Sequence, residues 1–339
     1  MKSVYREIDA LVNRVSEGLR VVEDLARFVF EVHPALIEEL KRIRHDLRKF
    51  FPADRLFAFR DVDADPKKEP ELIEAKTSIK SVVISNFKRV EESLRSLEEI
   101  WDINLKSLRF RVYALEKEFL KVFPRLGPIY LITQRTLRPD LDDDAYISFI
   151  ENLVKTGYID VVQVREKGLP GEFRKKMALL LRESCREHEC TLIVNDDPFL
   201  AMEVEADGVH LGYEDYPVSG VRSVFSRFYP IGVVGYSPED EDDILRKKQF
   251  CDYLGVGDVF GTSTKPDAGR PIGIEGLKKR VELAGEVPVF AVGGITPENF
   301  KAVLEAGAYG AAFCSAVLNS SNPERTLESF IKALTYVKY

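Results

Sequence analysis

The chain has 339 residues, of which 45% are apolar and 31% charged, with 49 Lys and Arg against 56 Asp and Glu. The apolar share is too large for a disordered protein, and the charged share is too large for an integral membrane protein. A net charge of −7 gives no general attraction to phosphate backbones, so nucleic acid is not an expected partner. The length suggests about two domains.

The N-terminal residues are charged and lack the apolar stretch of a secretory signal, and no apolar run is long enough to cross a membrane. The four cysteines form no CxxC pair and no metal-ligand spacing. We therefore expect a cytoplasmic protein with reduced cysteines and no membrane partner.

Residues 1–122 contain little glycine and show helical periodicity. Apolar residues recur every three or four positions between Ile8 and Ala26, which predicts one buried helix face. A second helix is expected over residues 34–50, and RDVDADPKKEPE, residues 60–71, is expected to be an exposed loop. The helical pattern ends near Phe123, so we predict an all-α N-terminal domain over residues 1–122.

Two segments of this domain resemble each other. RVSEGLRVVEDL, from Arg14 to Leu25, and RVEESLRSLEEI, from Arg89 to Ile100, share Arg, Val, Glu, Leu, Arg and Glu at identical offsets. A pseudo-symmetric repeat would explain the match, and so would two amphipathic helices with similar composition. The sequence leaves both explanations open.

From residue 129 onward, short β-branched runs alternate with helix-like stretches. Parallel βαβ units are built from this alternation, and eight of them in about 210 residues match a (β/α)₈ barrel. A doubly wound open sheet is the alternative, but no GxGxxG follows the first strand. We therefore predict an α/β protein with a C-terminal TIM barrel over residues 123–339. Its strands are expected in IYLIT, DVVQVR, TLIVN, DGVHLG, IGVVGYS, CDYLGVG, PVFAVGG and YGAAF.

Polar residues follow several of these strands, at the end where barrel enzymes have their active sites. Gln163, Arg165 and Lys167 follow the second strand, and an amide with two cations suits a polyanion. Asp196 and Asp215 follow neighbouring strands near these cations, an arrangement expected where Mg²⁺ joins protein and phosphate oxygens. Helix N-capping is the alternative role for both carboxylates, and an ordinary ion pair is the alternative for the cations.

Later strands are followed by groups that can bind phosphate. The loop GDVFGTSTKPDAGRP offers hydroxyl groups and a lysine, and the glycine pair after strand seven and Ser315 after strand eight lie where many barrels bind phosphate. Two phosphate-bearing ligands are therefore implied, although the glycines could equally form a plain turn. His210 is interpreted as structural rather than as a base, and Cys314 as a packing residue with no base nearby.

The motifs VQVREK, NDD, ADGVHLGYED, YLGVGDVFGTSTK, AVGGITPEN and GAYGAAFCSAV occur in this order, and the chain resembles thiamine phosphate synthase over residues 129–335. The resemblance implies that 4-amino-5-hydroxymethyl-2-methylpyrimidine diphosphate is joined to 4-methyl-5-(2-phosphoethyl)thiazole with release of diphosphate. It implies a dissociative reaction in which diphosphate leaves before the thiazole nitrogen attacks. The related thiazole tautomerase is the alternative, but it lacks the Asn-Asp pair and the complete T-x-T-K loop that this chain contains.

The resemblance also implies roles for individual residues. It places Ser237 in the Gly-x-Ser turn after strand five, although an ungapped register would put Val234 there; we favour Ser237 because the GYS context matches. The expected catalytic residues are Ser237, Lys265 and Arg165, and the expected metal ligands are Asp196 and Asp215. The pyrimidine diphosphate would be bound by Gln163, Arg165, Lys167, Asn195 and Lys265. The remaining substrate-binding candidates, assigned mainly to the thiazole phosphate, are Thr262, Thr264, Gly294, Cys314 and Ser315.

The N-terminal domain, through DALVNRVSEGLRVVEDLARF and IRHDLR, resembles a helical domain often fused to this synthase. That family is associated with phosphorylation of hydroxymethylpyrimidine phosphate, which implies ATP and Mg²⁺ as ligands. A non-catalytic dimerisation module is the alternative, since solvated ion pairs produce the same charge spacing and no P-loop is present. Homo-oligomer formation is left open. The candidate residues are Asn13, Arg14, Glu17, Arg20, Asp24, Arg44, His45 and Asp46.

Overall fold

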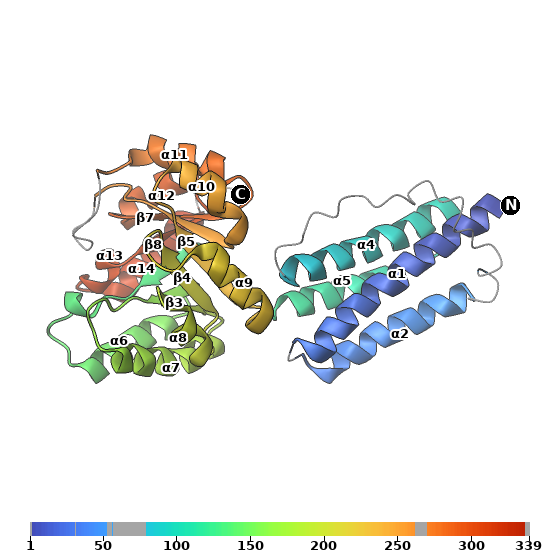
Figure 1. Cartoon of the computed structure of the whole chain (residues 1–339), viewed down its shortest axis with the longest axis horizontal. Coiled ribbons are helices and arrows are strands. Elements are labelled where there is room, and N and C mark those ends of the chain that lie inside the picture. The colour runs from blue at the N-terminus through green and yellow to red at the C-terminus, as the bar shows by residue number, and fades with distance from the viewer. Residues whose placement is uncertain (1, 31, 53–55, 57–78, 262–269, 336–339) are drawn as a thin grey trace. The chain divides into compact units, whose positions relative to one another are not determined.

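The computed structural model describes residues 2–30, 32–52, 56, 79–261 and 270–335 (Figure 1). The chain divides into two compact units, Met1–Phe123 and Pro124–Tyr339. Within the described residues, every helix is too short or too polar to span a bilayer. The expected loop at residues 60–71 lies outside the described residues.

The first unit is helical, as predicted. Its described part contains α1 (Lys2–Phe28), α2 (Pro34–Phe50), α4 (Ile79–Trp101) and α5 (Lys106–Leu120). Helix α1 packs against α2 and α4, and α5 packs against the same two helices, so the four enclose one core (Figure 1). The periodic residues Val15, Leu19 and Val22 of α1 are completely buried there. The single tryptophan of the chain, Trp101, ends α4.

The two similar segments lie in α1 and α4, which pack on each other. Val90 and Leu94 of α4 are completely buried, as are the residues that match them in α1. A Cβ atom at Gly18 would lie 2.8 Å from Val90 Cγ2 and 3.1 Å from the Asn86 carbonyl oxygen. A glycine therefore allows the close approach of the two helices at their centre.

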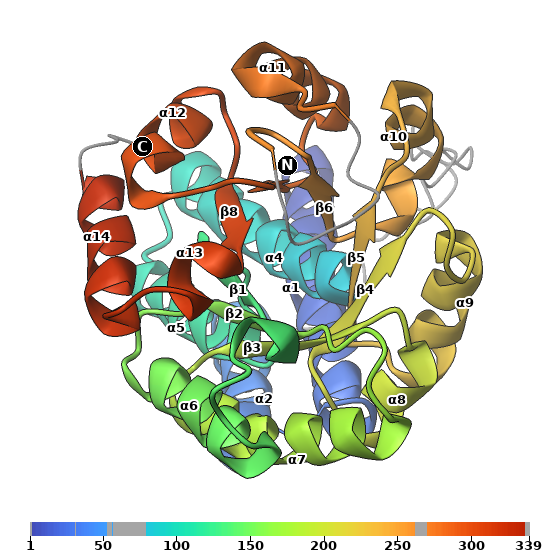
Figure 2. The same cartoon turned by 90° about the vertical axis from the view of Figure 1, so that its left-hand side faces the viewer.

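The second unit is a closed barrel of eight parallel strands, β1 to β8 in chain order, within the described residues. The alternation of strands and helices thus predicted the correct architecture, and the open-sheet alternative is excluded. Figure 2 shows helices surrounding the strands. The strands are β1 (Ile129–Ile132), β2 (Val161–Val164), β3 (Thr191–Asn195), β4 (Gly208–Gly212), β5 (Val233–Ser237), β6 (Tyr253–Val256), β7 (Val289–Val292) and β8 (Gly310–Phe313).

Helices follow the strands along the chain and cover their outer face, where residues such as Val162 and Val164 join the main core. The helices are α6 (Asp143–Lys155), α7 (Gly171–Glu187), α8 (Pro198–Glu203), α9 (Val218–Phe228), α10 (Glu241–Lys247), α11 (Gly273–Ala284), α12 (Pro297–Glu305), α13 (Ser315–Leu318) and α14 (Pro323–Thr335), with short 3₁₀ turns η1 (Arg135–Leu137) and η2 (Lys248–Phe250).

A second, smaller core fills the inside of the barrel. Tyr130, Val161, Ile193, Tyr253 and Phe290 point inward from five strands and are almost completely buried. Because side chains alternate along a strand, the next inward positions lie closer to the carboxyl ends. The inner core therefore closes the barrel and leaves the carboxyl ends of the strands for polar groups.

Three aspartates tie the strands together at their amino ends. Asp160, Asp207 and Asp252 each precede an even-numbered strand, and each carboxylate accepts a backbone N–H from the odd-numbered strand before it. The donors are Ile129 N at 2.9 Å, Leu192 N at 2.7 Å and Val234 N at 2.7 Å. This end of a TIM barrel usually serves stability rather than catalysis.

Candidate active site

Two amide side chains lie at the carboxyl ends of neighbouring strands. Gln163 of β2 and Asn195 of β3 are buried, and Gln163 Nε2 donates a hydrogen bond of 2.6 Å to Asn195 Oδ1. Each amide retains an N–H group that this bond does not use. The pair therefore offers fixed, neutral donors to a ligand in the barrel mouth.

A carboxylate pair lies beside the amides. Lys167 Nζ is 3.1 Å from Asp196 Oδ2, and Asp215 Oδ2 accepts the backbone N–H of Gly212. Burial and the neighbouring Asp215 carboxyl raise the pKa of Asp196 to about 6. Two carboxyl groups held this close are better accommodated when a proton or a cation lies between them.

Neither Asp196 nor Asp215 has the helix N-capping role that was their alternative. Asp197, not Asp196, accepts the backbone N–H of Leu200 and caps α8. Asp196 itself adopts a left-handed backbone conformation with φ of 63°. Asp215 closes a turn after β4 and does not cap α9, whose N-cap position is Pro217. Both predicted metal ligands are therefore free of helix capping.

The carboxylates line an open pocket of about 500 Å³. Arg174 and Tyr216 also line it, and Arg174 Nε has no hydrogen-bond partner among the described residues. The part of the chain that the structure describes contains no group of three or more His, Cys, Asp or Glu side chains that could hold a metal ion. Mg²⁺ commonly binds through one or two carboxylates while substrate phosphates and waters complete its shell, and the pair fits that mode.

Ser237 ends β5 and lies inside the barrel mouth, whereas Val234 faces the outer core. Ser237 Oγ is 2.8 Å from Nε2 of His210, whose Nδ1 is 3.0 Å from the Tyr253 hydroxyl. Burial, together with the cations Arg165 and Lys167, lowers the pKa of His210 to about 4. His210 is thus a neutral imidazole bonded to the serine, a link that the sequence does not reveal.

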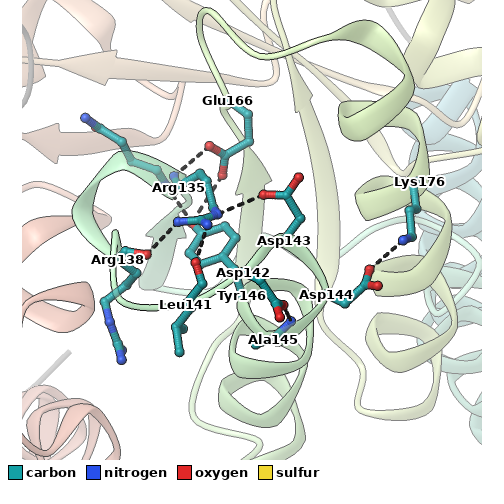
Figure 3. A network of polar contacts seen from close by, with 11 residues as sticks. Arg135, Arg138, Leu141, Asp142, Asp143, Asp144, Ala145, Tyr146, Glu166 and Lys176 are labelled. Atoms are coloured by element: carbon teal, nitrogen blue, oxygen red, sulfur yellow. Dashed lines mark hydrogen bonds and ion pairs between the residues drawn. The ribbon is translucent and has the colours of Figure 1, made fainter.

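Arg165 follows β2 and is half-buried, with its backbone N–H bonded to Thr133 Oγ1. The next residue, Glu166, is buried, and burial raises its pKa. It accepts hydrogen bonds from Arg135 N at 2.7 Å and from the Tyr146 hydroxyl at 3.2 Å (Figure 3). Glu166 therefore joins the end of β2 to the loop after β1.

Arg135 continues this network within the loop, as Figure 3 shows. Its guanidinium binds the Asp143 carboxylate at 3.1 Å and the carbonyl oxygens of Arg138 and Leu141. The loop at this side of the mouth is thereby held by side chains of its own. Sequence reasoning missed Glu166 because two functional candidates flank it.

The glycine pair after β7 packs closely on the segment that follows β6. A Cβ at Gly294 would collide with the carbonyl oxygen of Gly261, and both Gly293 and Gly294 have positive φ, 96° and 64°. Phe260 N donates to the Gly293 carbonyl at 3.2 Å. The pair thus has the structural role of a tight turn, and its predicted phosphate contact remains a prediction.

Two of the remaining barrel candidates, Cys314 and Ser315, lie within the described residues. Ser315 begins α13, and Cys314 before it is half-buried, with its Sγ 3.9 Å from Gln134 Oε1. Burial raises the pKa of the Cys314 thiol to about 12, so it is no nucleophile at neutral pH. Thr262, Thr264 and Lys265 lie outside the described residues.

The N-terminal candidates fall into two groups. Arg44 pairs with the buried Glu23, and the Asp46 carboxylate accepts hydrogen bonds from Arg111 and Lys49 at 2.7 and 2.8 Å. His45 is exposed. The α1 candidates Arg14, Glu17, Arg20 and Asp24 are exposed, and Asn13 is half-exposed. The α1 group is therefore available to a ligand, whereas Arg44 and Asp46 already bind other helices.

Comparison with known proteins covers both units. The family model described as thiamine monophosphate synthase matches residues 129–317, and the model described as the ThiD2 family matches residues 6–118. The thiamine-phosphate synthase of Synechocystis is 35% identical over 350 residues, which covers 99% of this chain and 97% of that protein. The protein of the same name from Gloeobacter violaceus is also 35% identical, over 98% of this chain and 97% of its own.

A solved structure is similar to the barrel. The thiamine phosphate pyrophosphorylase of Pyrococcus furiosus is 33% identical with a TM-score of 0.54, over 61% of this chain and 95% of that one. The relatives therefore match the full chain, and the structure matches the part that forms the barrel. The chain belongs to the thiamine monophosphate synthase family.

Proposed function

We propose that the barrel joins hydroxymethylpyrimidine diphosphate to thiazole phosphate and releases thiamine phosphate and diphosphate. The observation that carries the proposal is the convergence of the buried amide pair, the cation Lys167 and the carboxylates Asp196 and Asp215 at one barrel mouth. Family membership supports the same reaction. A tautomerase has no leaving diphosphate and no need for this set of charges.

The reaction breaks the bond between the pyrimidine methylene carbon and a diphosphate oxygen, which keeps the electron pair. The thiazole nitrogen then forms the new bond to that carbon. Gln163 and Asn195 hold the aminopyrimidine through fixed N–H groups, and Arg165 and Lys167 neutralise the departing diphosphate. Lys265 and the hydroxyl groups of Thr262 and Thr264 are assigned to phosphate binding.

Asp196 and Asp215 are the residues that would hold Mg²⁺. Bound there, the ion would supply charge neutralisation to diphosphate oxygens. Arg174 lines the same pocket and adds a cation there, and its Nε has no hydrogen-bond partner among the described residues. With that ion bound, the pocket would suit a strongly anionic leaving group.

We also propose that the N-terminal unit phosphorylates hydroxymethylpyrimidine phosphate with ATP, which supplies the substrate of the barrel. The match of residues 6–118 to the ThiD2 family supports this activity. The exposed polar stripe of Glu17, Arg20 and Asp24 on α1 supports a ligand site there, because these side chains lie on one helix face.

One assay with two arms tests both proposals on the full chain. The first arm contains pyrimidine diphosphate, thiazole phosphate and Mg²⁺. The second arm contains the same components, except that pyrimidine monophosphate and ATP replace the pyrimidine diphosphate. Thiamine phosphate is expected in both. Asp196→Ala should abolish both arms, whereas Arg20→Ala should lower only the second, by about 10-fold or more.

Arg95→Ala is the matched control for Arg20. Arg95 occupies the equivalent position in the similar segment of α4, but its guanidinium pairs with Glu99 at 2.6 Å. We expect the Arg95→Ala variant to form as much product as the wild type in both arms. Failure of the first arm would refute the synthase proposal. Product in the first arm alone would refute the kinase and favour a non-catalytic N-terminal module.

A further inference from the structure

A continuous chain of hydrogen bonds crosses the inside of the barrel mouth. From Asn195 it passes through the Gln163 amide to the Tyr130 hydroxyl at 3.3 Å, and from there to the Tyr253 hydroxyl at 2.8 Å. His210 Nδ1 is 3.0 Å from the Tyr253 hydroxyl, and its Nε2 is 2.8 Å from Ser237 Oγ. The chain thus connects the amide pair at β2 and β3 to the serine at β5.

The orientation of the Gln163 amide, with Nε2 toward Asn195 and Oε1 toward Tyr130, sets the direction of every hydrogen bond that follows. Gln163 donates through Nε2 to Asn195, so its Oε1 accepts from the Tyr130 hydroxyl. A hydroxyl group has one hydrogen, so Tyr130 must accept from Tyr253. Tyr253 in turn has no hydrogen left for His210, which must donate through Nδ1.

The direction of the chain determines what the serine can do. A neutral imidazole that carries its hydrogen on Nδ1 has an unprotonated Nε2, which can only accept. The Ser237 hydroxyl therefore donates its one hydrogen to His210. Only the oxygen lone pairs of Ser237 remain for a molecule in the barrel mouth.

The barrel leaves space for this chain at two glycines. A Cβ at Gly235 would overlap the Tyr253 ring, and a Cβ at Gly255 would lie 3.0 Å from Ser237 Oγ and 3.1 Å from His210 Cε1. Tyr130 and Tyr253 are almost completely buried, so water does not compete for their hydroxyl groups. Buried hydrogen bonds of this kind hold one arrangement more firmly than exposed ones.

We propose that Tyr130 and Tyr253 are positioning residues that hold His210 in the Nδ1–H tautomer, so that Ser237 acts only as a hydrogen-bond acceptor toward the substrate. Such an acceptor suits an N–H group or a developing positive charge and disfavours a phosphate oxygen. This assignment rests on the proposed synthase function, in which an aminopyrimidine becomes cationic as diphosphate leaves. Ser237 then stabilises the cation by a preorganised dipole.

The tautomer can be measured directly by NMR on the ligand-free full chain labelled with ¹⁵N-histidine. Only four histidines are present, and the His210→Gln variant identifies the resonances of His210. We expect Nδ1 of the wild-type residue to be protonated and Nε2 to be unprotonated. An Nε2–H tautomer in the wild type would overturn the proposal without bearing on the synthase activity.

Tyr130→Phe tests the direction of the chain. Without the Tyr130 oxygen as acceptor, the Tyr253 hydroxyl can donate to Nδ1, which moves the histidine hydrogen to Nε2 and turns Ser237 into a donor. We expect the reversed tautomer and a kcat about 10-fold lower, with KM for both substrates changed less than about 2-fold. An unchanged tautomer with unchanged kcat would contradict the proposal.

Tyr229→Phe is the matched control, because its hydroxyl bonds the Ala206 carbonyl outside the chain. It removes a tyrosine hydroxyl but should change neither tautomer nor kcat. A purely structural role for Tyr130 would lower stability in both variants and leave the tautomer alone. If Tyr130→Phe fails to fold, the wild-type spectrum still decides the assignment. Absence of synthase activity in the wild type would refute the proposed function while leaving the tautomer measurable.

Discussion

Neighbouring residues at the barrel mouth have different roles that the sequence alone does not distinguish. Asp196 and Asp197 are adjacent and chemically identical, yet one belongs to a crowded carboxylate pair and the other caps a helix. Tyr130 and Tyr253 lie in apolar strand runs to which the sequence analysis assigned no polar role. Their hydroxyl contacts depend on strands that are far apart in sequence, so no local pattern could predict them.

Asp196→Asn should stabilise the barrel at pH 8 in the absence of Mg²⁺. The pKa of Asp196 is raised to about 6 from an ordinary 3.8, so its favourable contribution is complete below about pH 4 and is lost as the pH rises through about 6. Asparagine removes the charge and tolerates a positive φ. We expect a gain of about 1 kcal/mol, or roughly 2–4 °C, at pH 8 and no gain at pH 4.

Calorimetry in the presence of a chelator measures this difference. Asp197→Asn is the control, because asparagine also caps a helix and the variant should melt like the wild type at both pH values. A midpoint at pH 8 that stays the same or falls in Asp196→Asn would show that the carboxylate pair does not strain the fold.

Elements of the barrel were predictable where their signals are local. Each of the eight expected strands contains an observed one, because β-branched runs bounded by turns and helices mark buried parallel strands. The connections made by Asp160, Asp207 and Asp252 were not predictable, since each carboxylate reaches a neighbouring strand across a helix-length connection. Sequence reasoning placed these aspartates inside strand patterns without a role.

Asp207→Ala should weaken the barrel and spare its chemistry. The substitution leaves the Leu192 N–H without its acceptor, which costs about 1–3 kcal/mol for a buried group. Asp207 precedes β4 at the amino end of the barrel, opposite the site, so kcat with pyrimidine diphosphate should not change. Asp207→Asn, which keeps an acceptor oxygen, should lose less stability. A large fall in kcat at a temperature where Asp207→Ala is folded would contradict this separation.

The whole molecule consists of two compact units, and the change from glycine-poor helical sequence to alternating strands predicts a boundary between them near Phe123. The architecture of both units followed from periodicity and composition. The kinase assignment did not, because exposed charges on a helix look alike whether they bind a ligand or water.

Leu19→Ala should destabilise the N-terminal unit selectively. Leu19 is completely buried between α1 and its neighbours, and its truncation costs about 2–5 kcal/mol. We expect an earlier calorimetric transition and loss of product from pyrimidine monophosphate and ATP on warming. Synthesis from the diphosphate should survive at the same temperature. Simultaneous loss of both activities would show that the units do not fold independently.

The position of Trp101 at the end of α4 gives the protein a built-in optical reporter. No other residue of the chain carries an indole, so emission excited near the red edge of the protein spectrum arises from the helical unit alone. A change in that emission on adding a nucleotide would register an event in the N-terminal unit, with no signal from the barrel to subtract. Ligand binding to the N-terminal unit can thus be followed on the full chain without attaching a dye.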